Sequence, residues 1–375
     1  MWFINDNLSP MKWNWQLKDW RNFSYQAELF EQSEQEFIDL SGQALGALRH
    51  IEKDGKAQLR VEIIRDEALQ SSEIEGEYLD RDSLQSSLRR QFGLQVNQEN
   101  QLLKEKGISE LLFSVFESYQ EPLSHELLQR WHGALFQKQR EDAGQYRQHS
   151  AAMQVVSGAI HNPTVHFEAP PSKQVVDELD ALIVWYNDQH EKKTTPPVAI
   201  AAITHLWFES IHPFEDGNGR VGRALAEKSL SQSLQRPALI SLSTAIQKKK
   251  SDYYAAFAKA QSGSDNEITS WIQYFLPLVI EAQQLSIKTI DFIIKKGRLL
   301  QEHQGSLNER QNKVILRVLQ EGVNGFKGGL SASNYRSITQ APTTTVTRDL
   351  NDLVAKGVLK RTGERKGTRY WLNFE

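Results

Sequence analysis

Residues 212–223 read HPFEDGNGRVGR and place an imidazole, a carboxylate, a glycine-rich turn and two guanidinium groups in one short stretch. The imidazole of His212 can accept a proton from a hydroxyl group near neutral pH. The carboxylate of Asp216 is the hard oxygen ligand that Mg²⁺ prefers beside a chain of phosphates. Together these side chains indicate a reaction at a phosphate group that uses a general base and a bound metal ion.

The elements that must position these groups follow from the neighbouring residues. An apolar segment precedes the stretch and an amphipathic one follows it, so we expect a helix, a tight loop and a second helix. Pro213 ends the first helix, because proline lacks an N–H group and clashes with the preceding turn. Gly217 and Gly219 allow loop backbone angles that other residues avoid, and Phe214 is predicted to plug the loop into the core.

The second helix is predicted to begin near Asn218, and its first turn is a natural site for an anion. The N–H groups there have no helical partner and carry positive partial charge. The backbone of Gly217, Asn218 and Gly219, with the Asn218 amide, can cradle phosphate oxygens. Arg220 and Arg223 share one side of the helix, where guanidinium groups suit phosphates. Each feature alone also occurs as a plain turn or a structural residue, but their ordered combination favours a functional site.

This combination resembles the signature of the Fic family, H-P-F-x-D/E-G-N-G-R-x-x-R, at every defining position. Members of this family transfer AMP from ATP to a Ser, Thr or Tyr hydroxyl of a protein and release pyrophosphate. The resemblance implies that His212 is the general base and that Asp216 holds Mg²⁺ as the cofactor. The residues that it implies for the phosphates of ATP are Gly217, Asn218, Gly219, Arg220 and Arg223, with Arg223 at the γ-phosphate.

A second pattern, formed by Ser71, Glu75 and Gly76, lies far upstream of the first. On a helix, Ser71 and Glu75 would share one face, and the glycine would end the helix. By itself the pattern is typical of an ordinary helix C-terminus. Beside the Fic signature it resembles the family's inhibitory motif, S/T-x-x-x-E-G/N, which implies that Glu75 pairs with Arg223 and blocks the γ-phosphate. In some relatives this glutamate also supports removal of AMP, so both directions of reaction stay open.

Two further segments complete the expected nucleotide site. Short extended runs at 154–156 and 165–167 flank a loop with glycine and proline, which predicts a β-hairpin. It resembles the family's flap, which lies over the nucleotide and aligns the target by strand addition.

The segment SDYYAAFAKAQ resembles the one that flanks adenine, which implies roles for Tyr254 and Gln261, two helical turns apart. Relatives often have asparagine at the second position, and core packing is the alternative for Tyr254.

Composition narrows the class of protein. The chain has 375 residues, of which 39% are hydrophobic and 24% charged, as in ordinary globular proteins. A net charge of −3 gives no overall reason to expect nucleic acid or a membrane as partner. Cysteine does not occur, which excludes disulfides, thiolate metal sites and a cysteine nucleophile and fits a reducing compartment. The sequence has no signal-peptide pattern and no run of about 18 apolar residues, so we expect a cytoplasmic protein without a membrane span.

These patterns predict a mainly α fold, with a Fic helical bundle and its hairpin flap followed by a winged helix-turn-helix domain. The predicted domains are an aromatic-rich N-terminal domain (1–55), a Fic domain (56–305) and the winged helix domain (306–375). The Fic domain would contain an inhibitory helix (about 60–78), the flap (about 145–170) and the core motif (212–223). We expect the N-terminal aromatic side chains to pack against the main body. A peptide-binding groove is the alternative use of these side chains.

The C-terminal tail is predicted to form three helices and then two strands around a basic loop, the order of a winged helix-turn-helix. From Leu307 onward twelve basic residues stand against six acidic ones, so the tail carries +6 while the whole chain carries −3. Such a wing can contact DNA or pack against protein.

The leading hypothesis is an autoinhibited protein adenylyltransferase, and the alternative is a DNA-binding regulator whose Fic domain senses nucleotide. Candidate partners are ATP, a target protein, DNA through residues 306–375 and a second copy of the chain.

Overall fold

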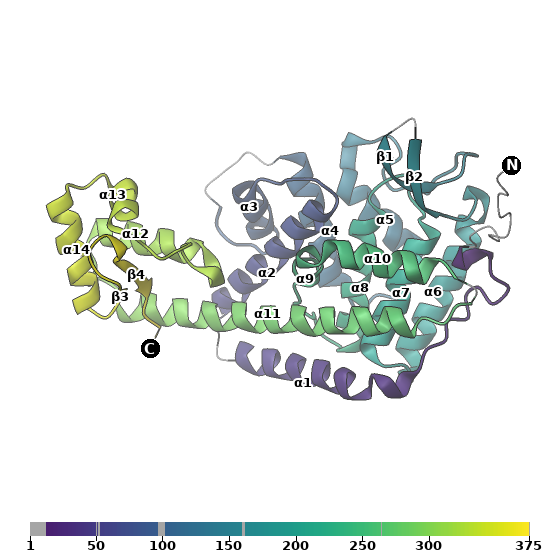
Figure 1. The fold of residues 1–375 in the computed structure, drawn as a ribbon, viewed down its shortest axis with the longest axis horizontal. Coiled ribbons are helices and arrows are strands. Elements are labelled where there is room, and N and C mark those ends of the chain that lie inside the picture. The colour runs from purple at the N-terminus through teal and green to yellow at the C-terminus, as the bar shows by residue number, and fades with distance from the viewer. Residues whose placement is uncertain are drawn as a thin grey trace, which may run out of the picture. The chain divides into compact units, whose positions relative to one another are not determined.

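The computed structural model describes residues 13–49, 51, 53–96, 102–159, 162–263 and 265–374. Helices make up most of this part of the chain, which confirms the predicted mainly α class (Figure 1). By its internal contacts the chain forms two units, the first made of residues up to 43 and 60–286, the second of 44–59 and residues from 287 onward. The three helices with residues in both units are α1 (Glu31–Leu48), α2 (Lys53–Ile74) and α11 (Thr269–Glu302). The division into three domains stays a prediction, and residues 1–12 of the first lie outside the described residues.

Helix α7 (Pro197–Ile211) is the central helix of the first unit. Its sequence, PVAIAAITHLWFESI, is apolar nearly all round, and a helix of this kind must be covered on every side. Every residue from Val198 to Phe208 is buried. The helix packs against α6 (Val175–Lys192) and α8 (Asn218–Ser233), so its C-terminal end is held firmly in place.

The remaining helices of the first unit are α3 (Arg81–Gln91), α4 (Leu103–Ser118), α5 (His125–Phe136), α9 (Leu242–Lys248) and α10 (Lys250–Gln261). Helix α4 packs against α3, α5 and α8, and α10 packs against α7. Among the described residues, no helix has both the length and the apolar character that crossing a membrane requires.

Aromatic residues of the N-terminal segment pack against the body of the first unit. Residues 13–30 form loops and short turns, and the first long helix begins only at Glu31. The Phe23 ring lies 5.4 Å from the Trp207 ring, edge to face, and the Trp13 ring lies 5.3 Å from that of Phe167. These contacts confirm the packing interpretation of the aromatic segment, since such ring pairs bury a large apolar area.

The predicted hairpin is present as strands β1 (Gln154–Ala159) and β2 (Asn162–Glu168). The strands are antiparallel, and Val156 stands opposite Val165. The register shifts between Val155 and Val156, and such an irregularity bends a strand and increases its twist. In Figure 1 the two strands stand at one edge of the first unit, above α10.

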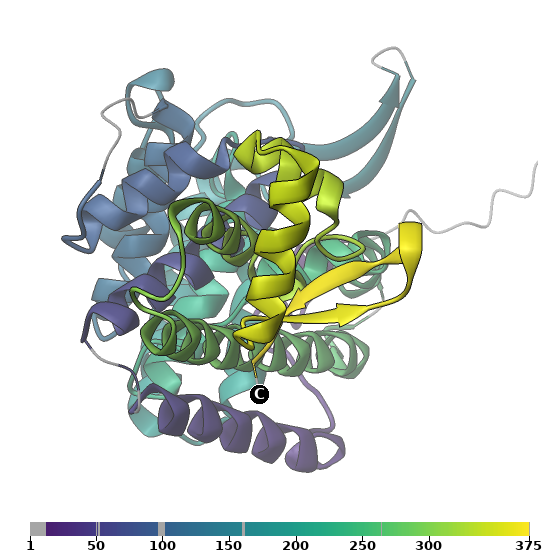
Figure 2. The same cartoon turned by 90° about the vertical axis from the view of Figure 1, so that its left-hand side faces the viewer.

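The second unit ends in three helices and two strands, in the predicted order. They are α12 (Glu309–Gln320), α13 (Ala332–Thr339), α14 (Thr343–Ala355), β3 (Leu359–Thr362) and β4 (Arg369–Leu372). Asn308 and Ser331 cap the first two of these helices through hydrogen bonds to backbone N–H groups, a contact that favours helix formation. Figure 2 shows the two strands as a ribbon beside α14. The winged-helix assignment stays a prediction.

Candidate functional site

The loop between α7 and α8 has the predicted helix–loop–helix form. Helix α7 ends at Ile211, two residues before Pro213. The residue between them, His212, has a φ of +50°, which lies in the left-handed region. A residue other than glycine seldom adopts this conformation, and such strain often marks a functional site. Gly217 caps α8 with a φ of +79°, as expected for a glycine at this turn.

Gly219 does not need an unusual backbone angle, so that part of the prediction was wrong. It lies inside α8, and a Cβ atom on it would clash with the Glu75 Oε1 atom and would meet the Arg223 Nη1 atom at 3.0 Å. The glycine therefore gives space in which a carboxylate can approach the first turn of the helix.

Asn218 and Phe214 hold the loop together from inside. The Asn218 side chain accepts a hydrogen bond from the Phe214 N–H at 2.9 Å and donates one to the Phe214 carbonyl at 2.8 Å. The Phe214 ring is fully buried and stacks on the His132 ring at 4.0 Å, which confirms its predicted role as a plug. One of the two N–H donors of the Asn218 amide is thus used in the loop, and phosphate binding here would also use the main-chain N–H groups.

Arg147 holds the C-terminal end of α7, a role that the sequence did not indicate. Its guanidinium group donates to the carbonyls of His212 at 2.7 Å, Ile211 at 3.1 Å and Pro170 at 2.5 Å. Burial lowers its pKa to about 10. The last carbonyls of a helix have no helical partner, so a buried cation at this position both satisfies them and favours the helix dipole.

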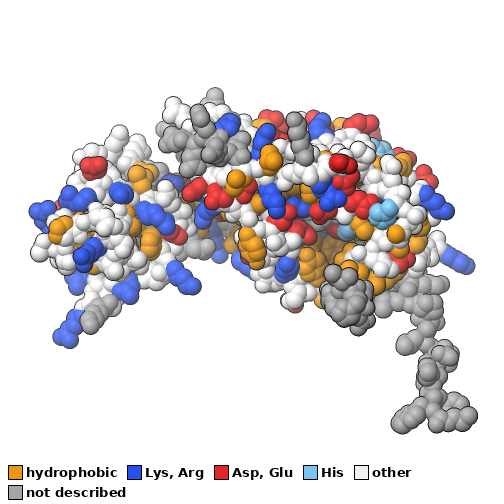
Figure 3. Space-filling view, turned by 90° about the horizontal axis from the view of Figure 1, so that it is seen from above, with side chains coloured by type: hydrophobic (Ala, Val, Ile, Leu, Met, Phe, Trp, Pro, Cys, Tyr) orange, Lys and Arg blue, Asp and Glu red, His pale blue; other side chains and the backbone are white. Residues whose placement is uncertain are grey.

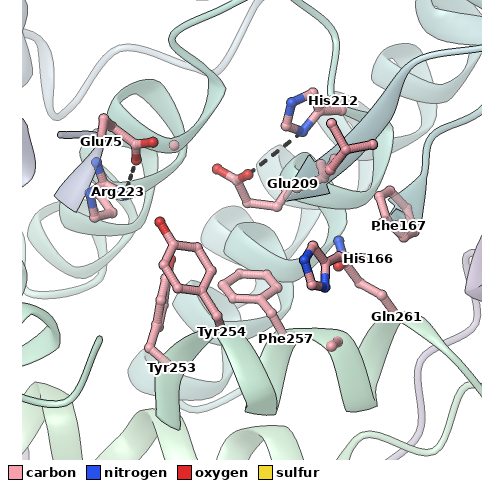
Figure 4. Close-up of a pocket in the computed structure, with 14 residues that line it drawn as sticks. Glu75, His166, Phe167, Glu209, His212, Arg223, Tyr253, Tyr254, Phe257 and Gln261 are labelled. Carbon is pink, nitrogen blue, oxygen red and sulfur yellow. Dashed lines mark ion pairs between the residues drawn. The ribbon is translucent and has the colours of Figure 1, made fainter. Parts of the chain in front are cut away.

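A cavity of about 510 Å³ opens between the hairpin, α7, α8 and α10 (Figure 4). Six residues named from the sequence line it, namely Glu75, His212, Gly219, Arg223, Tyr254 and Gln261. Other lining residues come from the hairpin (Val155, Val156, His166 and Phe167) and from α7 and α10 (Glu209, Tyr253, Phe257 and Ala258). Segments that are far apart in the sequence thus share one concave site, and ligand sites are commonly of this kind and size.

His212 faces this cavity with an imidazole that is mostly buried, its side chain being 18% exposed. Burial lowers its pKa to about 4, against the opposite effect of the Glu209 main-chain carbonyl. The ring is therefore neutral near pH 7 and can accept a proton. Its Nδ1 atom lies 3.8 Å from the Glu209 carboxyl group and makes no hydrogen bond within the described part of the chain.

Glu209 is a cavity residue that the sequence reading missed. Burial, with the negative charge of Glu75 as a second cause, raises the pKa of its carboxyl group to about 8. The sequence could have indicated a role for Glu209, because it is the one acidic residue in the apolar helix that leads to His212. A carboxyl group in such a helix is costly unless a specific contact retains it.

Arg223 lines the cavity, and Glu75 points toward it (Figure 4). Its Nη1 atom is 2.8 Å from the Glu75 Oε1 atom, and its Nε atom donates to the Ser71 hydroxyl at 3.0 Å. The guanidinium side chain is only 2% exposed. Helix α2 ends at Ile74, not near residue 78 as predicted, so Glu75 and Gly76 form the turn after it, where Gly76 has a φ of +81°.

Arg220, in the first turn of α8, and Asp216, just before that helix, are not among the cavity-lining residues. The Arg220 Nη1 atom is 2.6 Å from the Glu77 Oε2 atom, and its Nη2 atom is 3.5 Å from the Asp216 Oδ1 atom. Asp216 is half exposed, and its other oxygen lies 3.5 Å from the Arg140 Nη1 atom. Gly217, Asn218, Ser71 and Gly76 are also outside the cavity lining.

The surroundings of Asp216 fit a magnesium ion that is bound together with phosphates. Within the described residues, no group of three or more His, Asp or Glu side chains could hold a metal ion alone. Mg²⁺ at phosphate sites commonly takes one or two protein carboxylates and fills its other positions with water and phosphate oxygens. A single half-exposed carboxylate just before the first turn of α8 suits that arrangement.

The two residues expected at adenine both lie on α10 and face the cavity (Figure 4). The Tyr254 side chain is 44% exposed, so the alternative of core packing was wrong for this residue. The core tyrosine is its neighbour Tyr253, whose hydroxyl lies 2.7 Å from the His205 Nε2 atom. Gln261 is buried and its amide is 3.5 Å from the Ser210 hydroxyl.

Comparison with known protein families gives two matches. Residues 122–230 match the Fic/DOC family, and residues 13–94 match a domain of unknown function, DUF4172. The chain is similar to protein adenylyltransferase fic-1 of Caenorhabditis briggsae, with 25% identity over 169 residues, 44% of this chain and 31% of that protein. A probable protein adenylyltransferase of Aquifex aeolicus is 27% identical over 172 residues, 41% of this chain and 51% of that protein. The chain thus spans from about a third to about half of the length of these relatives.

Solved structures include one that matches nearly the whole chain. It is the crystal structure of a Fic family protein from Desulfovibrio desulfuricans, with 22% identity and a TM-score of 0.51. The match covers 91% of this chain and 95% of that one. At this identity the likeness concerns the fold, and it confirms the predicted Fic fold.

Proposed function

Because this chain is a Fic family protein, with its Fic/DOC domain at residues 122–230, we propose that it is a protein adenylyltransferase. It would transfer AMP from ATP to a Ser, Thr or Tyr hydroxyl of a target protein or of itself. The observation that supports this most is that a neutral, buried imidazole and the first turn of α8 meet at one cavity. The adenylyltransferase names of the two curated relatives support the same reaction.

In the proposed reaction, His212 takes the proton of the target hydroxyl. The hydroxyl oxygen then bonds to the α-phosphorus of ATP, the bond from that phosphorus to the bridging oxygen breaks, and pyrophosphate leaves. The N–H groups of Gly219 and Arg220, at the start of α8, would hold phosphate oxygens, so the chain contributes mainly position and charge. Mg²⁺ held by Asp216 would add positive charge beside those oxygens.

The hairpin would orient the target. Its valines are partly exposed, with Val156 at 49% and Val165 at 40%, and they lie beside the cavity that contains His212. An extended target segment could pair with the edge of β1 or β2 by main-chain hydrogen bonds, as in other cases of strand addition. Selection of the target would then depend little on its individual side chains near the hydroxyl.

Glu75 would restrain the reaction in the resting protein. A carboxylate 2.8 Å from the Arg223 guanidinium group occupies the cation expected at the γ-phosphate and adds negative charge there. ATP would then bind poorly or with its α-phosphorus misplaced. The same carboxylate could orient a water molecule toward an AMP-modified hydroxyl, so removal of AMP is the alternative direction for the same site.

The mass of the protein after incubation with ATP tests the proposed reaction. We expect the Glu75→Gly variant, incubated with ATP and Mg²⁺, to gain the mass of an AMP group on itself, because the restraint on ATP is removed. The variant that carries both Glu75→Gly and His212→Ala should gain nothing. A gain of a phosphoryl group in place of AMP, or no gain in either protein, would count against the adenylyltransferase.

A specific observation in the second unit favours DNA contact as a second candidate function. Three of its acidic residues are paired within the unit, Asp349 with Arg310, Asp352 with Lys356 and Glu321 with Arg317. Exposed basic residues lie on α14 and on β3 with the loop that follows it, namely Arg348, Arg361 and Arg365. Among the charged side chains on the side of this unit seen in Figure 3, Lys and Arg are more frequent than Asp and Glu. A regulator whose Fic domain senses nucleotide would use this surface on the phosphate backbone.

Binding of the full chain to labelled duplex DNA at several salt concentrations tests this second candidate. We expect Arg361→Glu with Arg365→Glu to weaken binding and to reduce its salt dependence, since phosphate contacts release counterions. The control is Lys313→Glu, a charge reversal at an exposed position of α12. Equal binding by the wild type and both variants would exclude this surface.

A further inference from the structure

The turn that follows α2 carries two carboxylates. Glu75 and Glu77 flank Gly76, whose φ of +81° lets the chain reverse after the helix. The turn is held by hydrogen bonds from the Gly76 N–H to the Glu73 carbonyl at 3.0 Å and from the Glu77 N–H to the Ser72 carbonyl at 2.9 Å. Both carboxylates consequently reach the same helix, α8.

Each carboxylate pairs with a different arginine of that helix. The Glu75 Oε1 atom lies 2.8 Å from the Arg223 Nη1 atom, and the Glu77 Oε2 atom lies 2.6 Å from the Arg220 Nη1 atom. We propose that Glu77 is a second inhibitory carboxylate, which closes Arg220 to the phosphates of ATP as Glu75 closes Arg223. This inference rests on the proposed function and concerns the regulation of the same site.

The Arg220 guanidinium group is almost closed to solvent while Glu77 is in place. Its side chain is only 5% exposed, and its Nη2 atom lies 3.5 Å from an Asp216 oxygen. Its Nε atom is buried and has no hydrogen-bond partner among the described residues. A phosphate oxygen must therefore displace Glu77 to reach the guanidinium group, and the negative charge of Glu77 opposes its approach.

The structure also provides a place for Glu77 when it leaves. Its side chain is 27% exposed, and its Oε1 atom already lies 3.5 Å from the Lys104 Nζ atom on α4. Lys104 is 57% exposed, so it can follow the carboxylate toward solvent. Glu77 could therefore exchange Arg220 for Lys104 and keep an ion pair, which lowers the cost of opening the site.

Removing Glu77 should make the site bind ATP more tightly. Without Glu77 the buried Arg220 guanidinium group loses its closest counter-charge, and an unpaired buried charge is costly. Phosphate oxygens of ATP would restore the pairing. If Glu77 served only to orient Arg220 for the phosphates, its removal would instead weaken ATP binding, so the sign of the change separates the two roles.

Calorimetric titration with Mg²⁺ and an ATP analogue that cannot be cleaved between its α and β phosphates tests the proposal. The proteins are the full-length wild type, Glu75→Gly, Glu77→Gln and the double variant. We expect Glu77→Gln to bind the analogue about ten-fold more tightly than the wild type. The double variant should bind it more tightly than Glu75→Gly by a similar factor, because in both cases one charge-assisted contact with a phosphate is gained. Adenosine, which lacks phosphates, should show no such gain.

Two matched variants make the result specific. Glu73→Gln removes a carboxylate at the end of α2 that contacts Gln70 at 3.3 Å, and it should bind ATP like the wild type. Lys104→Met removes the alternative partner of Glu77 at an exposed position, so it should fold and bind ATP more weakly than the wild type. Stronger binding by Lys104→Met would contradict the exchange.

Weaker or unchanged ATP binding in Glu77→Gln and in the double variant would overturn the role of Glu77. If the wild type and Glu75→Gly bind the analogue while Glu77→Gln brings no gain, only this inference fails. If none of the four proteins binds the analogue, the proposed adenylyltransferase fails as well. Thermal unfolding of each variant shows whether a loss of binding is a loss of folding.

Discussion

At the scale of single residues, His212 combines a strained backbone with a buried ring. Its left-handed φ of +50° turns the side chain out of the line of α7 and toward the cavity. Burial keeps the imidazole neutral by lowering its pKa to about 4. A base of this kind is available over a wide pH range, although it is weaker than a histidine in water.

The first prediction concerns this base. In the Glu75→Gly background, His212→Ala should lower AMP transfer by about 10²–10⁴-fold, the usual contribution of general base catalysis. The pH–rate profile of Glu75→Gly should lose activity on the acid side near pH 4, because only then does the imidazole carry a proton. An acid limb centred near the ordinary histidine pKa of about 6.5 would contradict the buried neutral ring.

The second prediction concerns Glu209 and stability. Its folded-state pKa of about 8 lies above its ordinary value of 4.5, so the folded protein keeps a proton that the unfolded chain has lost. This group therefore lowers the stability of the wild type progressively as the pH rises from about 4.5 to about 8. The free energy of unfolding of Glu209→Gln, relative to that of the wild type, should therefore increase by on the order of 1–3 kcal/mol from pH 5 to pH 8. Thermal or urea unfolding at several pH values measures this difference. A stability difference that does not change with pH would refute this.

At the scale of elements, the sequence predicted the helices, turns and strands that depend on neighbouring residues. The helix–loop–helix around residues 212–223, the hairpin and the order of helices and strands in the second unit follow from apolar spacing, glycine and proline. Contacts between distant segments were not predictable in this way. Glu77 lies 143 positions from Arg220, and Arg147 lies 65 from His212, so nothing in their spacing indicates a pair. The Asn218 amide has a further role that its spacing did not indicate, because it also holds its own loop together.

The third prediction concerns Arg147 as the support of the end of α7. Arg147→Met leaves three carbonyls without their buried donor, so it should destabilise the protein by roughly 2–4 kcal/mol. The matched control is Arg130→Met, whose exposed ion pair with Glu121 should contribute less than about 1 kcal/mol. Urea unfolding of both variants gives the comparison. A similar small loss in both would mean that Arg147 does not support the helix end.

At the scale of the whole molecule, the carboxylates proposed as a restraint and the arginines that they contact belong to the same unit. Ser71, Glu75 and Glu77, at the end of α2 and in its turn, contact Arg220 and Arg223 within the first unit of one chain. The proposed inhibition therefore needs no second copy of the protein.

The fourth prediction follows from this arrangement. The specific activity of the wild type should stay low when the protein is diluted, because an intramolecular contact does not depend on concentration. Initial rates of AMP transfer across a dilution series measure this. A specific activity that rises on dilution would show that another copy of the chain supplies the inhibitory contact.

The central claim is that this protein transfers AMP and is restrained by Glu75. The most direct test is the incorporation of AMP from α-labelled ATP with Mg²⁺ by the wild type and by Glu75→Gly, with the protein itself as acceptor. We predict strong labelling of Glu75→Gly and very weak labelling of the wild type. Equal labelling of the two proteins would contradict the restraint, and no labelling of either would contradict the transfer itself.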